Sequence, residues 1–70
     1  MFFVYVLESE IDKQFYIGFT ESLDERVAVH NSGKVESTKN RRPLKLIYYE
    51  AYLDKHDAQG REKFLKSGSG

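Results

Sequence analysis

The sequence predicts a small α+β domain in which a three-stranded antiparallel β-sheet is flanked by helices. Three stretches, over residues 2–7, 15–20 and 44–52, are apolar and rich in aromatic or β-branched side chains, which is typical of strands. Two others, over about 22–31 and 54–66, space their apolar residues as helices do. At 70 residues the chain is long enough for one domain with a small core.

The first two strands are expected to form a hairpin. The run Phe2–Leu7 is apolar on both alternating faces, which indicates a central strand covered on both sides. The polar connection to the second strand is short and contains Asp12-Lys13, a plausible turn. So short a connection requires the two strands to pair in antiparallel fashion.

A turn at Asp12-Lys13 also predicts the register of the hairpin. Three pairs are expected to face each other: Tyr5 with Thr20, Leu7 with Gly18, and Ser9 with Tyr16. The two tyrosines and Gly18 then share one face of the sheet. A glycine inside a strand weakens pairing, so Gly18 is predicted to let another group or a ligand approach the backbone closely.

The first helix carries two polar residues beside its apolar stripe. Thr20 or Ser22 is expected to cap its N-terminus, and Gly33 is expected to stop it. Arg26 and His30 lie one turn apart next to the stripe, where they point toward the sheet. Taken singly, Arg26 is typical of a solvated helix residue, and His30 of a residue that stabilises a helix C-terminus.

Glu62 lies between Ala58 and Leu65 on the apolar side of the last helix. A carboxylate in such a place is costly unless it is paired or holds a metal ion. Two interpretations stay open. Glu62 either has a structural role, in an ion pair with Arg26, Arg61 or a lysine or by reaching solvent at the edge of the core, or it binds a hard cation such as Mg²⁺. Such a cation uses one or two carboxylates together with phosphate oxygens.

The connection over residues 32–43 has no apolar periodicity and is expected to be a loop. It and its boundary carry a basic cluster: Lys34, Lys39, Arg41, Arg42 and Lys45. The net charge of the chain is zero, which argues against a protein that depends on non-specific DNA affinity. A local cluster can nevertheless guide a nucleic-acid backbone.

Composition excludes several classes of protein. The chain has no cysteine, which rules out disulfides and cysteine-based zinc sites. No apolar run reaches the roughly 18 residues that span a membrane, and the N-terminus has no signal-peptide pattern. A cytoplasmic protein is expected, and residues 67–70 are expected to be a frayed end.

Five residues together resemble the signature of the GIY-YIG nuclease superfamily. The second half of the motif is intact as Tyr16-Ile17-Gly18, and Phe3-Val4-Tyr5 keeps the tyrosine of the first half. The arginine of the family, eight positions after the glycine, matches Arg26, and a histidine four further on matches His30. The glutamate of a later helix matches Glu62.

The resemblance covers nearly the whole chain and is greatest to small single-domain bacterial members, a group similar to the N-terminal domain of excinuclease C. Phe3 replaces a glycine of the family motif. Relatives continue past Gly70 with a basic stretch, so the chain is expected to be a single domain over residues 1–70 that lacks this extension.

The resemblance implies a metal-dependent endonuclease that hydrolyses DNA phosphodiester bonds in DNA repair or processing. Its implied catalytic residues are Tyr5, Tyr16, Arg26, His30 and Glu62, with one Mg²⁺ or Mn²⁺ ion on Glu62. Tyr5 or Tyr16 would activate or orient the attacking water. Arg26 would stabilise the charge that develops on the phosphate, and His30 would assist proton transfer.

The implied partner is DNA, expected to be branched, damaged or single-stranded. Its backbone would be bound by four residues of the basic cluster: Lys39, Arg41, Arg42 and Lys45. A homodimer or a protein partner is a further expectation. Two other functions stay open: a catalytically weak or inactive nucleic-acid-binding module on the same scaffold, and an oligomerising structural protein that uses the aromatic third strand.

Overall fold

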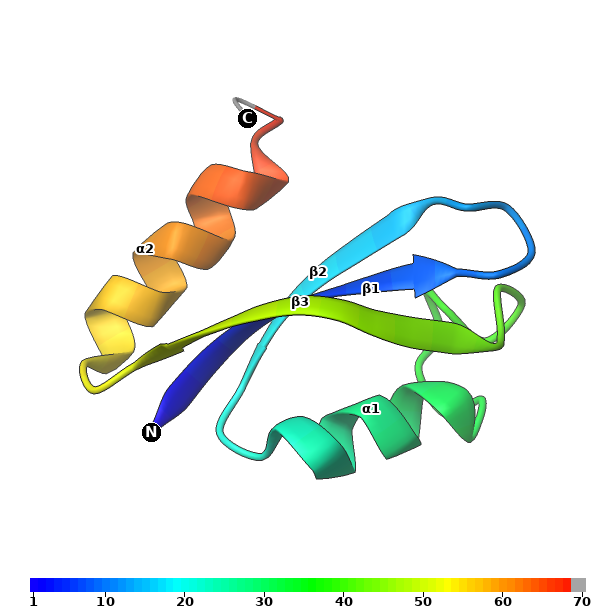
Figure 1. Ribbon diagram of the computed structural model, residues 1–70, viewed down its shortest axis with the longest axis horizontal. Coiled ribbons are helices and arrows are strands. Elements are labelled where there is room, and N and C mark those ends of the chain that lie inside the picture. Colours follow the sequence, from blue (N-terminus) through cyan, green and yellow to red (C-terminus); the bar gives the residue numbers. More distant parts are fainter. Residues whose placement is uncertain (69–70) are drawn as a thin grey trace.

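One sheet and two helices make up the computed structural model, which describes residues 1–68 (Figure 1). The elements follow in the order β1 (Phe2–Ser9), β2 (Phe15–Thr20), α1 (Leu23–Asn31), β3 (Leu44–Tyr52) and α2 (Lys55–Lys66). The strands lie in the order β2-β1-β3, and both pairs are antiparallel. The predicted α+β class is confirmed, and β1 is central as its apolar pattern predicted. Of the predicted frayed end, residues 69 and 70 lie outside the described part.

The register of the β1–β2 hairpin differs from the predicted one by two residues. Tyr5 pairs with Gly18 and Leu7 with Tyr16, whereas the turn at 12–13 would place Tyr5 opposite Thr20. A shift by two keeps every side chain on its face of the sheet. The prediction that both tyrosines and Gly18 share one face therefore holds, although the three predicted pairs are wrong.

Ser9 explains the shift, because it closes the turn one residue earlier along the chain. Its amide donates to the carbonyl of Gln14 at 3.0 Å, and its hydroxyl accepts from the amides of Ile11 at 3.2 Å and Asp12 at 3.3 Å. Lys13 takes a positive φ of 61° and donates to the Ser9 carbonyl at 2.9 Å. Residues 10–13 thus form the turn, which is centred between positions 11 and 12.

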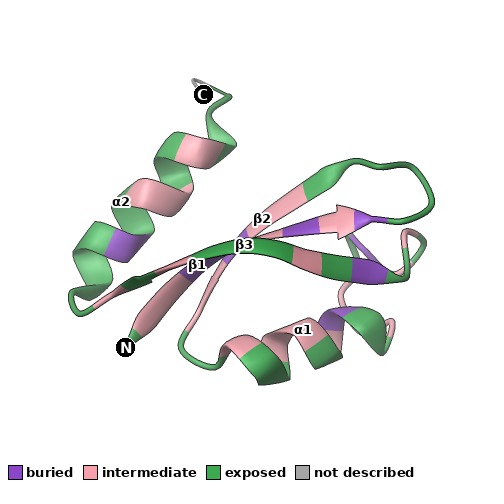
Figure 2. Cartoon of the chain, viewed as in Figure 1, coloured by how far each residue is buried: buried purple, intermediate pink, exposed green. Residues whose placement is uncertain are grey.

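Helix α1 covers the face of the sheet that carries Tyr5. The buried cluster there consists of Tyr5, Leu7 and Leu44, and four partly buried residues pack against it: Tyr16, Leu23, Val27 and Leu46. Figure 2 shows that fully buried positions concentrate in β1. Burying one large apolar side chain contributes about 1.5–3 kcal/mol, so this small cluster carries much of the fold.

Both ends of α1 are close to those predicted. Ser22 occupies the N-cap position, and its amide donates to the Thr20 hydroxyl at 3.1 Å. Gly33 has a φ of 85°, a left-handed conformation that stops a helix after its last turn. The side chain of Asn31 then ties the end of α1 to β3, because it accepts from the Leu44 amide at 2.8 Å and donates to the Leu44 carbonyl at 2.9 Å.

Helix α2 begins after Asp54, whose carboxylate accepts from the amides of His56 at 2.7 Å and Asp57 at 3.2 Å. Its inward face includes Ala58, which is fully buried. A second anchor joins the helix to β3, because Arg61 donates to both carboxylate oxygens of Glu50 at 3.0 and 3.2 Å. Neither helix of the described part is long and apolar enough to cross a membrane.

The predicted loop over residues 32–43 is a series of turns packed against the sheet. Its Thr38 is completely buried, and the amides of Thr38 and Lys39 both donate to the Val35 carbonyl, at 3.1 and 2.9 Å. The hydroxyl of Ser9 donates to the Arg41 carbonyl at 2.7 Å, which fastens the loop to the hairpin. The loop therefore has a defined position next to the C-terminal end of α1.

Candidate active site

Tyr5 is the centre of the candidate site. Its side chain is 1% exposed and lies over Gly18 on the neighbouring strand, where the Cβ atom of any other residue would collide with the phenol. The hydroxyl is within 2.9 Å of Nε2 of His30, and Nε of Arg26 donates to it at 3.3 Å. The prediction that Gly18 admits a close group is confirmed, and that group is Tyr5.

His30 is fully buried at the end of α1, with both ring nitrogens occupied. Nε2 contacts the Tyr5 hydroxyl, and Nδ1 lies 2.9 Å from the hydroxyl oxygen of Thr38. Burial, and then the positive charge of Arg26, lower the pKa of His30 from its usual 6.5 to about 4. The imidazole is therefore neutral at neutral pH.

Arg26 interacts with both tyrosines. Its pKa is raised above the usual value, first by its hydrogen bond to Tyr5 and also by its interaction with Tyr16. Burial raises the pKa of the Tyr5 phenol above 10.0, although the hydrogen bond from Arg26 offsets part of that effect. Tyr5 is therefore a neutral phenol that holds a guanidinium in place.

Tyr16 lies beside this pair and is less deeply buried than Tyr5. Its ring packs edge-on against His30 with the centroids 4.7 Å apart, and it lies 6.3 Å from the Tyr5 ring. The ammonium group of Lys66, from the end of α2, lies 6.0 Å from the centroid of the Tyr16 ring. Tyr16 thus contacts groups of both helices.

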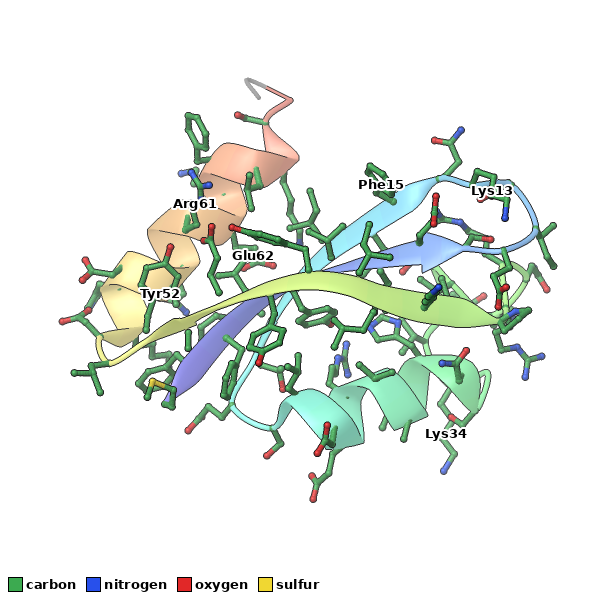
Figure 3. All side chains as sticks on the ribbon, in the orientation of Figure 1. Lys13, Phe15, Lys34, Tyr52, Arg61 and Glu62 are labelled. Atoms are coloured by element: carbon green, nitrogen blue, oxygen red, sulfur yellow. The ribbon has the colours of Figure 1, made fainter. Side chains whose placement is uncertain are left out.

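Glu62 points from α2 toward the strands (Figure 3). Its side chain is 21% exposed and pairs with Lys66, one turn further on, at 2.8 Å. Its negative charge contributes to the raised pKa of Tyr5, which places the carboxylate within electrostatic reach of the phenol. An ion pair with a lysine was one of the interpretations left open by the sequence. Because the pair is partly exposed, it contributes little to stability.

The five predicted residues thus lie in one region, on two strands and two helices. Tyr5, Arg26 and His30 are joined by direct hydrogen bonds. Tyr16 contacts this group through its ring. Glu62 pairs with Lys66, whose ammonium group lies near the Tyr16 ring, and its negative charge raises the pKa of Tyr5.

A divalent ion would find only one carboxylate here. Within residues 1–68 no group of three or more histidine or acidic side chains is arranged to hold a metal ion. Glu62 could serve as a single protein ligand, which suits Mg²⁺ or Mn²⁺ only where water and phosphate oxygens complete the shell. The donor set therefore fits an ion that is shared with a phosphate substrate.

The predicted nucleic-acid-binding residues have different environments. Lys39 pairs with Glu36 at 3.0 Å, and Arg41 pairs with Asp12 at 3.2 Å. Lys45 is exposed on β3.

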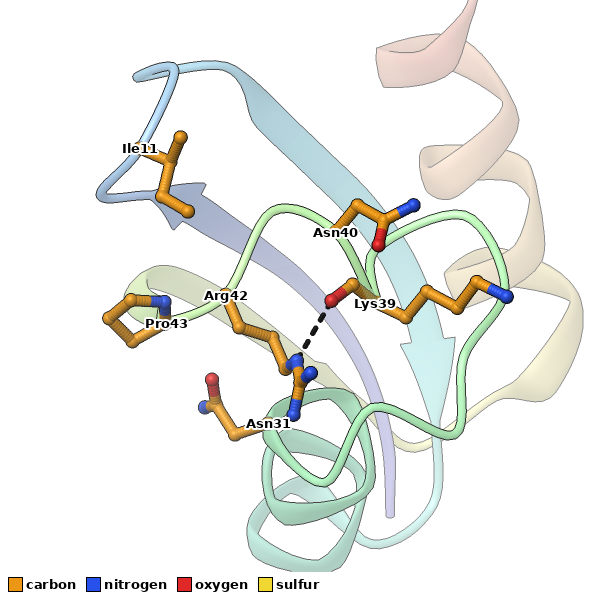
Figure 4. A pocket seen from close by; sticks show the side chains of 6 residues that line it. All are labelled: Ile11, Asn31, Lys39, Asn40, Arg42 and Pro43. Atoms are coloured by element: carbon orange, nitrogen blue, oxygen red, sulfur yellow. Dashed lines mark hydrogen bonds between the residues drawn. The ribbon is translucent and has the colours of Figure 1, made fainter.

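The guanidinium of Arg42 packs against Gly33, where a Cβ atom would be 2.9 Å from Nη1. Its Nε donates to the Lys39 carbonyl at 2.8 Å, which aims the guanidinium into a surface pocket of about 530 Å³ (Figure 4). Six residues line the pocket: Ile11, Asn31, Lys39, Asn40, Arg42 and Pro43.

Thr38 and a cluster around Glu50 were not among the predicted site residues. Thr38 is buried against His30, and no pattern in a polar loop distinguishes it from its neighbours. Glu50 accepts hydrogen bonds from Tyr48, Tyr52 and Arg61, and those from Tyr48 and Tyr52 are the main reason that its pKa falls to about 2. The alternation of Tyr48, Glu50 and Tyr52 along one strand face is the signal that could have revealed this second cluster.

Comparison with known proteins gives a consistent result. Residues 1–70 match the family described as the GIY-YIG catalytic domain. A UPF0213 protein of Pediococcus acidilactici is 44% identical over 71 residues, covering 97% of this chain and 71% of that protein. A UPF0213 protein of Clostridium perfringens is 39% identical over 67 residues, covering 94% of this chain and 71% of that protein.

A solved structure shows the same fold. The solution NMR structure of a UPF0213 protein from Bacillus halodurans is 35% identical, with a TM-score of 0.60, and the match covers 96% of this chain and 72% of that one. The predicted family is confirmed by both kinds of similarity. The chain therefore belongs to the GIY-YIG catalytic domain family, a family of nuclease-type hydrolases.

Proposed function

We propose that this protein is a divalent-metal-dependent endonuclease that hydrolyses phosphodiester bonds of DNA. The observation that carries the proposal is the position of Arg26, which is held by the Tyr5 hydroxyl and interacts with Tyr16. A planar guanidinium fixed next to two phenols is well suited to bind phosphate oxygens. The convergence of Tyr16 and Glu62 on the same region supports a reaction there rather than binding alone.

The two tyrosines have different roles in this proposal. Tyr5 is buried, hydrogen-bonded and harder to ionise than a free tyrosine, so it positions Arg26 and does not act as a base. Tyr16 is the more exposed phenol and orients the attacking water. The buried, neutral His30 supports Tyr5, and this environment argues against the proton transfer that the family resemblance implies for it.

Arg26 stabilises the negative charge that develops on the phosphate. Its orientation is set before substrate binds, so little reorganisation is needed during the reaction. Glu62 would exchange its ion pair with Lys66 for a divalent ion. When bound, such an ion polarises the leaving oxygen and neutralises charge on the phosphate.

The experiment is a nicking assay on branched, single-stranded and duplex DNA with Mg²⁺ or Mn²⁺. Arg26→Ala should lower the cleavage rate by about 10²–10³-fold, the usual cost of removing a fixed donor to a transition state. Glu62→Ala should abolish the metal-dependent cleavage, because the variant lacks the carboxylate that would hold the ion. Glu25→Ala and Lys63→Ala, which change exposed residues of α1 and α2, are matched controls that should cleave as the wild type does.

Metal binding can be measured apart from cleavage. Mn²⁺ should broaden the amide NMR signals of residues around Glu62 in the wild type and leave them sharp in Glu62→Ala. Equal cleavage by wild type, Arg26→Ala and Glu62→Ala would assign the activity to a contaminant and refute the proposal. The substrate panel also tests the predicted preference for branched, damaged or single-stranded DNA, and light scattering tests the predicted homodimer.

A nucleic-acid-binding module without useful catalysis is the second candidate. It is favoured by the ion pair between Glu62 and Lys66 at 2.8 Å, because this pair engages the carboxylate that the nuclease would need for its metal ion. Retarded migration of DNA without any cleavage, in the presence of either metal, would support this candidate over the nuclease.

A further inference from the structure

We propose that Thr38 is a positioning residue: its hydroxyl oxygen accepts a hydrogen bond from Nδ1–H of His30, which leaves Nε2 free to accept a hydrogen bond from the Tyr5 hydroxyl. The effect of Thr38 on cleavage rests on the proposed function. Its effect on the protonation site of His30 does not, because that site can be measured in the protein alone.

The geometry leaves two arrangements of protons in this chain of hydrogen bonds. Thr38, His30 and Tyr5 follow one another at 2.9 Å each, and all three are buried. In one arrangement Tyr5 donates to Nε2 and Nδ1 donates to Thr38. In the other, Thr38 donates to Nδ1 and Nε2 donates to Tyr5. The neutral ring carries one proton, so the partner of one nitrogen decides the role of the other.

The hydrogen bond from Arg26 to Tyr5 favours the first of these two proton arrangements. Nε of Arg26 donates to the Tyr5 oxygen, and the positive charge makes the phenol proton a better donor. In the first arrangement this oxygen accepts from Arg26 while its proton goes to His30. In the second, the oxygen accepts from both Arg26 and His30, and its own proton must find a further partner in a site where Tyr5 is 1% exposed. The first arrangement therefore satisfies the donors around Tyr5 better.

A continuous series of hydrogen bonds connects Thr38 to Arg26. Thr38 fixes the protonated nitrogen of His30, His30 fixes the direction of the Tyr5 hydroxyl, and the Tyr5 oxygen faces Arg26. Because Thr38 belongs to the loop that carries Lys39 and most of the basic cluster, displacement of the loop would also disturb the site.

The test compares three variants by NMR and by nicking. Thr38→Val keeps nearly the same shape but removes the hydroxyl, whereas Thr38→Ser keeps the hydroxyl. Ser37→Ala changes the adjacent, exposed hydroxyl residue and is the matched control. Imidazole ¹⁵N shifts report which nitrogen of His30 is protonated, and the exposed His56 in the same spectrum is an internal reference.

We expect wild type, Thr38→Ser and Ser37→Ala to have His30 protonated on Nδ1. Thr38→Val should move the proton to Nε2, since Nδ1 loses its acceptor, and should lower the cleavage rate by about tenfold, as loss of partners that orient metal-binding histidines does. Thr38→Ser should retain wild-type cleavage, which a residue needed only to fill space would not explain.

Two results would overturn the inference. One is a wild-type protein with His30 protonated on Nε2, which can be seen even if Thr38→Val does not fold. The other is a folded Thr38→Val that keeps the wild-type protonation site. If the wild type cleaves no DNA, the proposed function fails, but the ¹⁵N spectra still decide the role of Thr38.

Discussion

Tyr5 occupies the space that a side chain on Gly18 would fill. The two residues are paired on adjacent strands, and a Cβ atom on Gly18 would overlap the hydroxyl oxygen and Cζ of Tyr5. The missing side chain lets the phenol lie flat along the sheet, where its hydroxyl meets Arg26 and His30. One glycine therefore supports both the core and the candidate site.

Gly18→Ala tests this relationship. The added methyl group should push the Tyr5 ring off the sheet and break its hydrogen bond to His30, because the atoms that it would overlap belong to the phenol itself. Overpacking of this kind costs about 1–3 kcal/mol, which should appear as a lower urea midpoint of unfolding. Cleavage should fall as well, since Arg26 loses its partner.

Gly60→Ala is the control for that substitution. Gly60 lies in the middle of α2, and apart from its chain neighbours and the nearby backbone of that helix no atom of the described residues comes within 4 Å of the position of its Cβ. Alanine should therefore stabilise the protein by about 1 kcal/mol through helix propensity and leave cleavage unchanged. If Gly18→Ala kept or raised the stability, as Gly60→Ala is expected to do, the special role of Gly18 would be wrong.

The strands, the helices and the face shared by Tyr5 and Gly18 could be predicted because they follow from local patterns. Alternation of side chains assigns the faces, and an even shift in register does not change them. The register itself depended on Ser9, whose amide and hydroxyl close the turn. A serine next to a strand has no sequence pattern that distinguishes this use from simple exposure.

The family resemblance predicted which residues belong to the candidate site. It did not predict how deeply each is buried or which of them contact each other. The sequence places Tyr5 on the central strand, but how deeply each phenol is buried depends on how α1 packs on the sheet. The link from Thr38 to His30 depends on the path of a loop without periodicity. Such contacts are set by tertiary structure, which local patterns do not encode.

Replacing each tyrosine by phenylalanine should separate their roles. Tyr5→Phe leaves Nε of Arg26 and the ring of His30 without their buried partner, so it should cost about 1–3 kcal/mol of stability and lower cleavage. Tyr16→Phe should keep the ring contacts and nearly full stability but abolish cleavage. Urea unfolding and the nicking assay measure the two effects. Full activity of Tyr16→Phe would exclude this residue from orienting the water.

His30 should make the stability of the protein depend on pH between about 6.5 and 4. Its pKa is about 4 in the folded protein and 6.5 in an unfolded chain, so the unfolded state binds the proton first as the pH falls. Its contribution is complete above pH 6.5 and is lost progressively down to pH 4. The urea midpoint of the wild type should decline over this range, and His30→Gln should remove that decline.

His56→Gln is the matched control, because His56 is exposed at the start of α2. It should retain the wild-type decline between pH 6.5 and 4. The same experiment bears on catalysis, since a neutral His30 predicts that the cleavage rate shows no histidine titration near pH 6.5. A titration there that disappears in His30→Gln would contradict the buried, neutral state.

Glu50 should make the stability of the protein depend on pH in a more acidic range than His30 does. Hydrogen bonds from Tyr48, Tyr52 and Arg61 lower its pKa from 4.5 to about 2, so its contribution is present above pH 4.5 and is lost as the pH falls toward 2. Glu50→Gln should unfold more easily at pH 7 but lose less stability between pH 4.5 and 2. Glu21→Gln, an exposed carboxylate before α1, should follow the wild-type curve. Parallel acid curves for wild type and Glu50→Gln would show that this network does not anchor α2 to β3.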